Sequence, residues 1–114
     1  MELSISVRTR EVDGTIREHV ERRLRFSLGR FQHRVERVRV RLEDVNGPRG
    51  GVDQRCLVVV ALKGLPRVVI EQLGVDPHAA IDRAMARAGR AVARQLEQAK
   101  QHSNGVREPW FAER

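Results

Sequence analysis

The sequence predicts an α+β domain in which two helices cover one face of a four-stranded sheet, with the elements in the order β-α-β-β-β-α. Three observations support this two-layer fold. Four short segments have the apolar pattern of strands, and two longer segments have the three-to-four spacing of helices. The connections in the second half of the sheet are short enough for hairpins. The length of 114 residues suits a single domain.

Four segments of the chain predict the strands. They are residues 3–8, 37–42, 56–62 and 67–72. In the first two, apolar residues alternate with polar ones, as in strands with one buried face. The connection 63–66 is a short turn, whereas 43–54 contains Asn46-Gly47-Pro48 and Gly50-Gly51 and is expected to be a loop. Two successive antiparallel hairpins follow from these connections.

A first helix is expected between the first two strands. Its apolar stripe comprises Ile16, Val20, Leu24, Leu28 and Phe31. Thr15 and Glu18 have the spacing of a capping box, and Asp13 is an alternative N-cap. Gly29 or the segment 32–33 is expected to end this helix.

A second helix is expected to begin at Asp76-Pro77, where an acidic N-cap precedes a proline at the first helical position. It can continue without a breaker to about Gln101. The predicted domain therefore spans residues 1–101. Residues 102–114 contain both glycine and proline and are expected to form a flexible C-terminal tail.

Charge restricts the classes of partner. The chain has 22 basic and 15 acidic residues, for a formal net charge of +7, and nearly all of the basic residues are arginine. This balance suits a polyanion, either nucleic acid or an anionic membrane surface. No apolar run approaches the roughly 20 residues of a membrane span, and the N-terminus does not resemble a secretory signal. We therefore expect a cytoplasmic protein that does not bind membranes.

Residues that could carry catalysis or bind a metal are scattered. Cys56 is the single cysteine of the chain, and its apolar surroundings predict a buried core residue. The four histidines are His19, His33, His78 and His102, and no other metal-binding residue lies at the spacing of a metal site from any of them. The glycine-rich phosphate loops of nucleotide-binding proteins do not occur. We expect no enzymatic activity, no cofactor, no metal and no small-molecule substrate.

The second helix carries the strongest functional signal. Its arginine stripe consists of Arg83, Arg87, Arg90 and Arg94. These residues fall within an arc of about 60°, opposite the alanine-rich side that faces the sheet. Acidic residues do not interrupt the stripe, so its like charges repel unless an anion relieves them. The stripe therefore predicts binding of a phosphate backbone, and the alternative is a solvated face in an arginine-rich chain. Small alanines also argue against a helix that enters a membrane surface.

A second basic row is expected on the strand 37–42. Arg37, Arg39 and Arg41 share one face of this strand, and Arg8 is a further candidate. We interpret this row as the solvent-exposed side of a sheet that is covered on one face only.

The second helix also resembles that of a known family. Its segments Asp76-Pro77-His78-Ala79-Ala80-Ile81-Asp82 and Arg94-Gln95-Leu96 resemble the Asp-x-Tyr-x-Ala-Ile-Asp and Arg-Gln-Leu signature of the hibernation-promoting factor family, which includes ribosome-associated inhibitor A. The Leu-Ser-Ile-Ser of the first strand and the segment 16–20 are also similar to that family. The resemblance covers residues 1 to about 100, with the same order of elements.

The resemblance implies a fold similar to double-stranded RNA-binding domains and a function on the ribosome. Members of the family bind the small ribosomal subunit at the subunit interface, over the sites of mRNA and tRNA, and inhibit translation in stress or stationary phase. For this chain, the resemblance implies that the arginine stripe contacts rRNA phosphates. Arg22 and Arg25 of the first helix are expected to assist, because they point away from its apolar stripe.

The sequence departs from the family at several points. His78 replaces a tyrosine, which puts a packing or stacking role at this position in doubt, and the loop 43–54 is long. The extra C-terminal domain through which long members pair ribosomes is not expected here, and nothing favours a homo-oligomer. Trp110 and Phe111 either anchor a partner or fold back on the domain. The alternative functions are an RNA- or DNA-binding module with another target, and an adaptor whose basic face binds an acidic protein.

Overall fold

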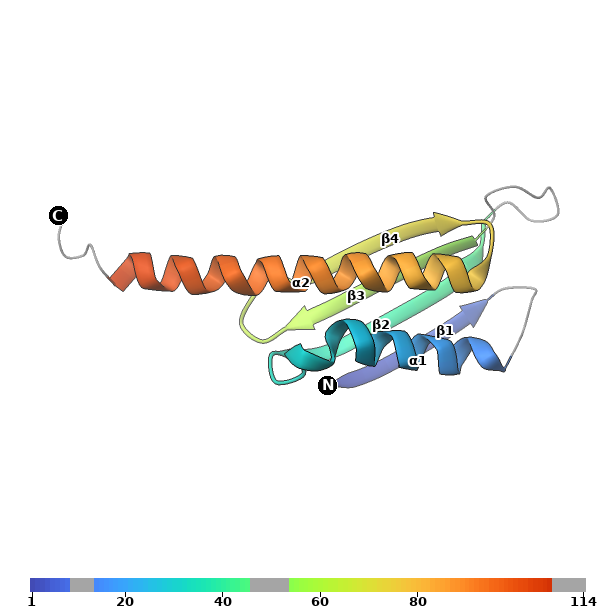
Figure 1. Ribbon diagram of the computed structural model, residues 1–114, viewed down its shortest axis with the longest axis horizontal. Coiled ribbons are helices and arrows are strands. Elements are labelled where there is room, and N and C mark those ends of the chain that lie inside the picture. The colour runs from blue at the N-terminus through green and yellow to red at the C-terminus, as the bar shows by residue number, and fades with distance from the viewer. Residues whose placement is uncertain (9–13, 46–53, 108–114) are drawn as a thin grey trace.

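The computed structural model describes residues 1–8, 14–45 and 54–107, with side chains as far as residue 101 (Figure 1). Its elements are β1 (Glu2–Arg8), α1 (Thr15–Leu28), the short 3-10 helix η1 (Gly29–Phe31), β2 (Val35–Asp44), β3 (Gln54–Leu62), β4 (Val68–Gly74) and α2 (Pro77–Arg107). The strands form one sheet in the order β1-β2-β3-β4, and both helices cover the same face of it (Figure 1). The structure confirms the predicted α+β fold.

The connections determine how the strands pair. β1 and β2 are parallel, because α1 carries the chain back along the sheet between them. The pairs β2–β3 and β3–β4 are antiparallel, which confirms the two predicted hairpins. The mixed sheet therefore has two edges, β1 and β4.

The core lies between the helices and the covered face of the sheet. Its buried residues include Ile16, Val20, Leu24 and Leu28 of α1, Val38, Val40, Leu42, Cys56, Val58 and Val60 of the central strands, and Ile81, Ala84, Met85, Ala88 and Val92 of α2. The apolar stripe predicted for the first helix is thus buried, except that Phe31 of η1 is only partly covered. Burial raises the pKa of the Cys56 thiol to about 12, so this residue is an un-ionised core side chain, as predicted.

The two helices begin differently. Asp76 caps α2 as predicted, because its Oδ2 accepts a hydrogen bond of 3.0 Å from the backbone N–H of Ala79. The capping box predicted for α1 is wrong, because Thr15 is the first helical residue and Gly14 occupies the N-cap position. The alternative cap, Asp13, lies outside the described residues.

The hairpin between β2 and β3 is longer than predicted. Glu43 and Asp44 continue β2 and Gln54 begins β3, so the predicted loop 43–54 is wrong at both ends. Cross-strand pairing explains the extension: Glu43 lies opposite Arg55 and Asp44 opposite Gln54, and each pair is joined by side-chain hydrogen bonds. The remainder of the predicted loop lies outside the described residues.

The C-terminal boundaries also extend beyond their predicted positions. β4 continues to Gly74, which pairs with the first residue of β3. α2 continues to Arg107, past the predicted end near Gln101. The glycine at position 105 costs about 1 kcal/mol relative to alanine in a helix, which is too little to end one. Residues 108–114, with Trp110 and Phe111, lie outside the described part of the chain.

α1 and α2 are in close contact where Gly89 faces the first helix. A Cβ atom at Gly89 would lie 2.9 Å from the backbone oxygen of Ser27, which is closer than real Cβ atoms approach other heavy atoms. The helices can approach this closely only because position 89 has no side chain.

Gly89→Ala is therefore expected to push the helices apart and lower the free energy of unfolding by about 1–3 kcal/mol, the typical cost of overpacking. Urea unfolding followed by circular dichroism measures this change. Gly29→Ala is the matched control, because a Cβ atom at Gly29 meets nothing within 4 Å and the backbone there is right-handed helical. Equal stability of the two variants would contradict the close contact.

Candidate nucleic-acid interface

The six arginines predicted to bind RNA lie on the outward side of the helices. Arg22 and Arg25 are exposed on α1, and Arg83, Arg87, Arg90 and Arg94 are exposed on α2. Within the described residues, the ion pairs of the helices involve other side chains. The side chains of five of these arginines, all except Arg87, also form no hydrogen bond with another described residue. Their positive charges are therefore available to an anion.

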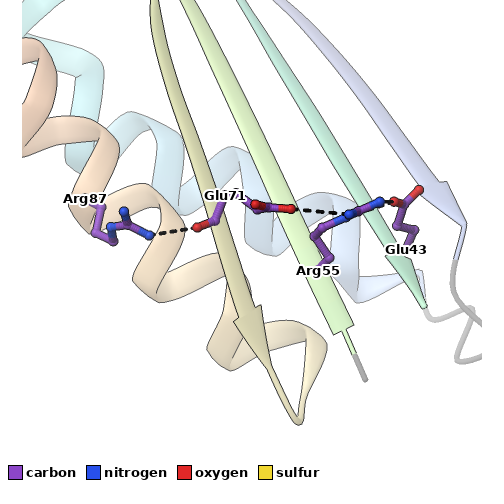
Figure 2. Close-up of polar contacts among 4 residues, drawn as sticks. All are labelled: Glu43, Arg55, Glu71 and Arg87. Carbon is purple, nitrogen blue, oxygen red and sulfur yellow. Dashed lines mark hydrogen bonds and ion pairs between the residues drawn. The ribbon is translucent and has the colours of Figure 1, made fainter. Parts of the chain in front are cut away.

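Arg87 has a structural contact that its sequence position does not reveal. Its Nη1 donates hydrogen bonds to the backbone oxygen of Glu71 at 2.8 Å and to Oε1 of Gln72 at 3.0 Å, and Figure 2 shows the bond to Glu71. The side chain thereby fastens α2 to the edge strand β4 and satisfies one of its backbone acceptors. Its predicted contact with phosphate remains a prediction.

A groove runs between α1 and α2 on this side of the molecule. The interhelical groove has a volume of about 370 Å³ and is lined by Arg23, Phe26, Ser27, Arg30, Ala86, Gly89 and Arg90. A second hollow of about 630 Å³ follows it between η1 and the C-terminal part of α2, and Arg30 lines both. The second hollow adds Arg34 and Lys100 as basic residues and Glu97 as an acid. The two hollows share Arg30, and the charged residues that line them are basic except for Glu97.

Sequence reasoning missed three residues of this groove: Arg23, Phe26 and Arg30. It found Arg22 and Arg25 because they point away from the apolar stripe of α1. The missed residues lie between that stripe and the outward side, where α2 approaches. Phe26 offered one signal, because it is a large apolar residue that does not fit the spacing of the stripe.

A polar cluster joins the helices at the N-terminal end of α2. His19 Nε2 and Asp82 Oδ1 are 2.6 Å apart, and Arg23 Nε lies 3.3 Å from the same oxygen. The rings of His19 and His78 meet edge to face, with centroids 4.8 Å apart. His78 thus has an aromatic packing contact although it replaces the tyrosine of the family signature. Among the residues that the structure describes, histidines, cysteines and acids form no group of three that could hold a metal ion.

On the uncovered face of the sheet, the arginines Arg55 and Arg37 are paired with acids. Arg55 of β3 bridges Glu43 of β2 and Glu71 of β4, as Figure 2 shows, with Nε 3.0 Å from Glu43 Oε2 and Nη1 3.3 Å from Glu71 Oε2. Arg37 forms an exposed ion pair of 3.1 Å with Glu2. The predicted second basic row is exposed on this face, and its residue Arg37 is neutralised there. On the helix face, none of the six predicted arginines forms an ion pair among the described residues.

The hydrogen bond from Arg55 lowers the pKa of the Glu43 carboxyl below its ordinary value of 4.5, and this effect exceeds the opposing effect of partial burial. A carboxyl whose pKa is lowered by folding stabilises the folded state above its unfolded pKa. That contribution to stability is lost as the pH falls through the pKa of the carboxyl in the folded state.

Glu43→Gln is therefore expected to be less stable than the wild type at pH 7, and the difference should shrink at pH 3. Urea unfolding at the two pH values measures it. Glu36→Gln is the control, because Glu36 is exposed on the same strand and forms no ion pair among the described residues. A difference between wild type and Glu43→Gln that is unchanged from pH 7 to pH 3 would contradict this assignment.

The fold and the site together define a small basic α+β domain with an arginine-lined groove between its two helices. None of the helices among the described residues has the length and apolar character to cross a membrane. The chain belongs to the family described as sigma 54 modulation protein / S30EA ribosomal protein, whose model matches residues 3–100. This match confirms the family that the second helix predicted.

Solved structures share the fold. The N-terminal domain of Protein Y from Thermus thermophilus is 31% identical, with a TM-score of 0.64 over 82% of this chain and 98% of that domain. A ribosomal subunit interface protein from Coxiella burnetii is 14% identical, with a TM-score of 0.59 over 80% of this chain and 94% of that one. A search of curated proteins gave no match.

Proposed function

We propose that this protein binds the small ribosomal subunit at the subunit interface, through the side of the molecule that carries α1 and α2, and inhibits translation during stress or stationary phase. The family is one of ribosome-associated proteins. The observation that carries the proposal is the set of exposed arginines on the helix side that form no ion pair among the described residues, of which Arg30 and Arg90 line the interhelical groove. Phosphate-rich RNA is the ribosomal component that suits such a surface.

The distribution of charge favours the helix side over the sheet side. On the uncovered sheet face, Glu2 pairs with Arg37, and both Glu43 and Glu71 pair with Arg55. Acids also lie on the helix side, where Glu18 and Glu21 are exposed on α1, Asp82 accepts contacts from His19 and Arg23, and Glu97 lines the second hollow. The centre of the helix side, around Arg90 and Arg94, has no ion pair among the described residues. A phosphate backbone is attracted most strongly to such a surface.

The arginines are carried on a rigid support. The close contact of Gly89 with Ser27, the His19–Asp82 contact and the hydrogen bonds of Arg87 fix α2 relative to α1 and to β4. A backbone support that is fixed before binding loses less conformational freedom when RNA binds. Inhibition then needs no catalysis, because a domain that occupies the path of mRNA and tRNA excludes them.

Arg83→Ala/Arg90→Ala/Arg94→Ala tests the proposal and leaves the structural residue Arg87 in place. Wild type is expected to co-sediment with small ribosomal subunits at one copy per subunit, and the triple variant to bind weakly. Losing three phosphate contacts should reduce the slope of log affinity against log salt by about 2–3. Sedimentation at several salt concentrations measures both quantities.

The matched control is Arg39→Ala/Arg41→Ala/Arg67→Ala, which removes the same charge from exposed, unpaired residues outside the helices. This control is expected to bind nearly as the wild type does. Equal losses in both triple variants would mean that net charge, and not the helix side, controls binding. A wild type that does not co-sediment at low salt would overturn the ribosomal function and favour another RNA or an acidic protein as partner.

A further inference from the structure

Phe26 is a large apolar residue of α1 that the fold leaves in solvent. It is 79% exposed, whereas the buried side of the same helix is formed by Ile16, Val20, Leu24 and Leu28. Folding therefore gains almost nothing from this ring. Its position is more informative than its exposure, because the ring stands at the margin of the interhelical groove among basic side chains.

One side of the ring is already in contact with a cation. The guanidinium carbon of Arg23 lies 5.1 Å from the ring centroid, within the range of a cation–π interaction. Arg23 is in turn held near Asp82, with its Nε 3.3 Å from the carboxylate oxygen. The ring is thus supported from one side, and its exposure leaves the other side open to a planar partner.

The groove beside Phe26 is lined by small and basic residues. Ser27, Ala86 and Gly89 are the small residues of this lining. Arg30 and Arg90 line the same groove, and among the described residues neither forms an ion pair. The residues that line it include no acid, and its volume of about 370 Å³ is in the range of small-ligand sites.

We propose that Phe26 is a stacking platform for an unpaired RNA base, and that Arg30 and Arg90 bind the phosphates on either side of that nucleotide. This assignment rests on the proposed RNA-binding function and deepens it, because it states that the bound RNA includes a single-stranded nucleotide. An aromatic ring next to a basic groove is the usual arrangement by which proteins bind single strands, and it tolerates any base. An acidic peptide would match the charges but would leave the open side of the ring without a planar partner.

The test uses a short uridine-rich RNA with a single 2-aminopurine, whose fluorescence falls when the base stacks. Wild type is expected to quench the fluorescence, whereas Phe26→Ala should bind about tenfold more weakly and quench little, as stacking energies imply. Phe26→Trp should retain quenching, and Phe26→Leu should not. These substitutions change a largely exposed side chain, so the fold should persist. Val69→Ala, at a 54% exposed position on β4, is the control and should bind as the wild type does.

An RNA of the same length whose residues are all abasic separates stacking from charge, because the proposed platform accepts any base. It should bind wild type and Phe26→Ala equally. The proposal is overturned if Phe26→Ala binds and quenches the first RNA as the wild type does, or if polyglutamate competes as well as RNA of the same length. Because this assay contains no ribosomes, its result is independent of the co-sedimentation result. The stacking proposal can therefore be confirmed or overturned even if the protein does not bind ribosomes.

Discussion

α1 and α2 approach each other so closely at Gly89 that the backbone oxygen of Ser27 occupies the space of a side chain. This contact sets the width of the interhelical groove and so the spacing between the basic residues of α1 and those of α2. The buried alanines of α2 likewise allow a close approach to the sheet, because their small side chains let the helix lie close to β3 and β4. Packing therefore fixes the backbone positions from which the outward arginines extend, and among them only Arg87 also has side-chain hydrogen bonds within the described residues.

Charged residues are arranged differently on the two faces of the molecule, because the helices cover only one face of the sheet. The uncovered face is built from cross-strand neighbours, so an acid and an arginine placed opposite each other pair directly, as Glu43 and Arg55 do. The arginines of α2 are neighbours of one another along the helix, and acids do not interrupt them. The fold thus gives a sheet face on which acids pair with Arg37 and Arg55, and a helix face whose arginine stripe forms no ion pair among the described residues.

The periodic parts of this fold could be predicted from the sequence, and the contacts across elements could not. The apolar stripe of α1, the Asp76 cap and the two hairpins depend on local spacing, and the structure confirms them. The ends of β2 and β3 depend on pairing between Glu43 and Arg55. These residues are 12 positions apart in the sequence and come into contact only when the hairpin forms. For the same reason, the contact of Arg87 with β4 and the groove around Phe26 and Arg30 become visible only when α2 is placed against its neighbours.

The central claim is that the helix side of the molecule faces rRNA, and directed cleavage of rRNA tests it most directly. An iron chelate that generates hydroxyl radicals can be attached at Glu18→Cys on the exposed side of α1, or at Val69→Cys on the uncovered sheet face. The native Cys56 does not interfere, because it is buried and burial raises its pKa to about 12. With the protein on small ribosomal subunits, the account predicts strong cleavage of rRNA from position 18 and little from position 69. Cleavage mainly from position 69 would show that the opposite face binds RNA and would contradict the account.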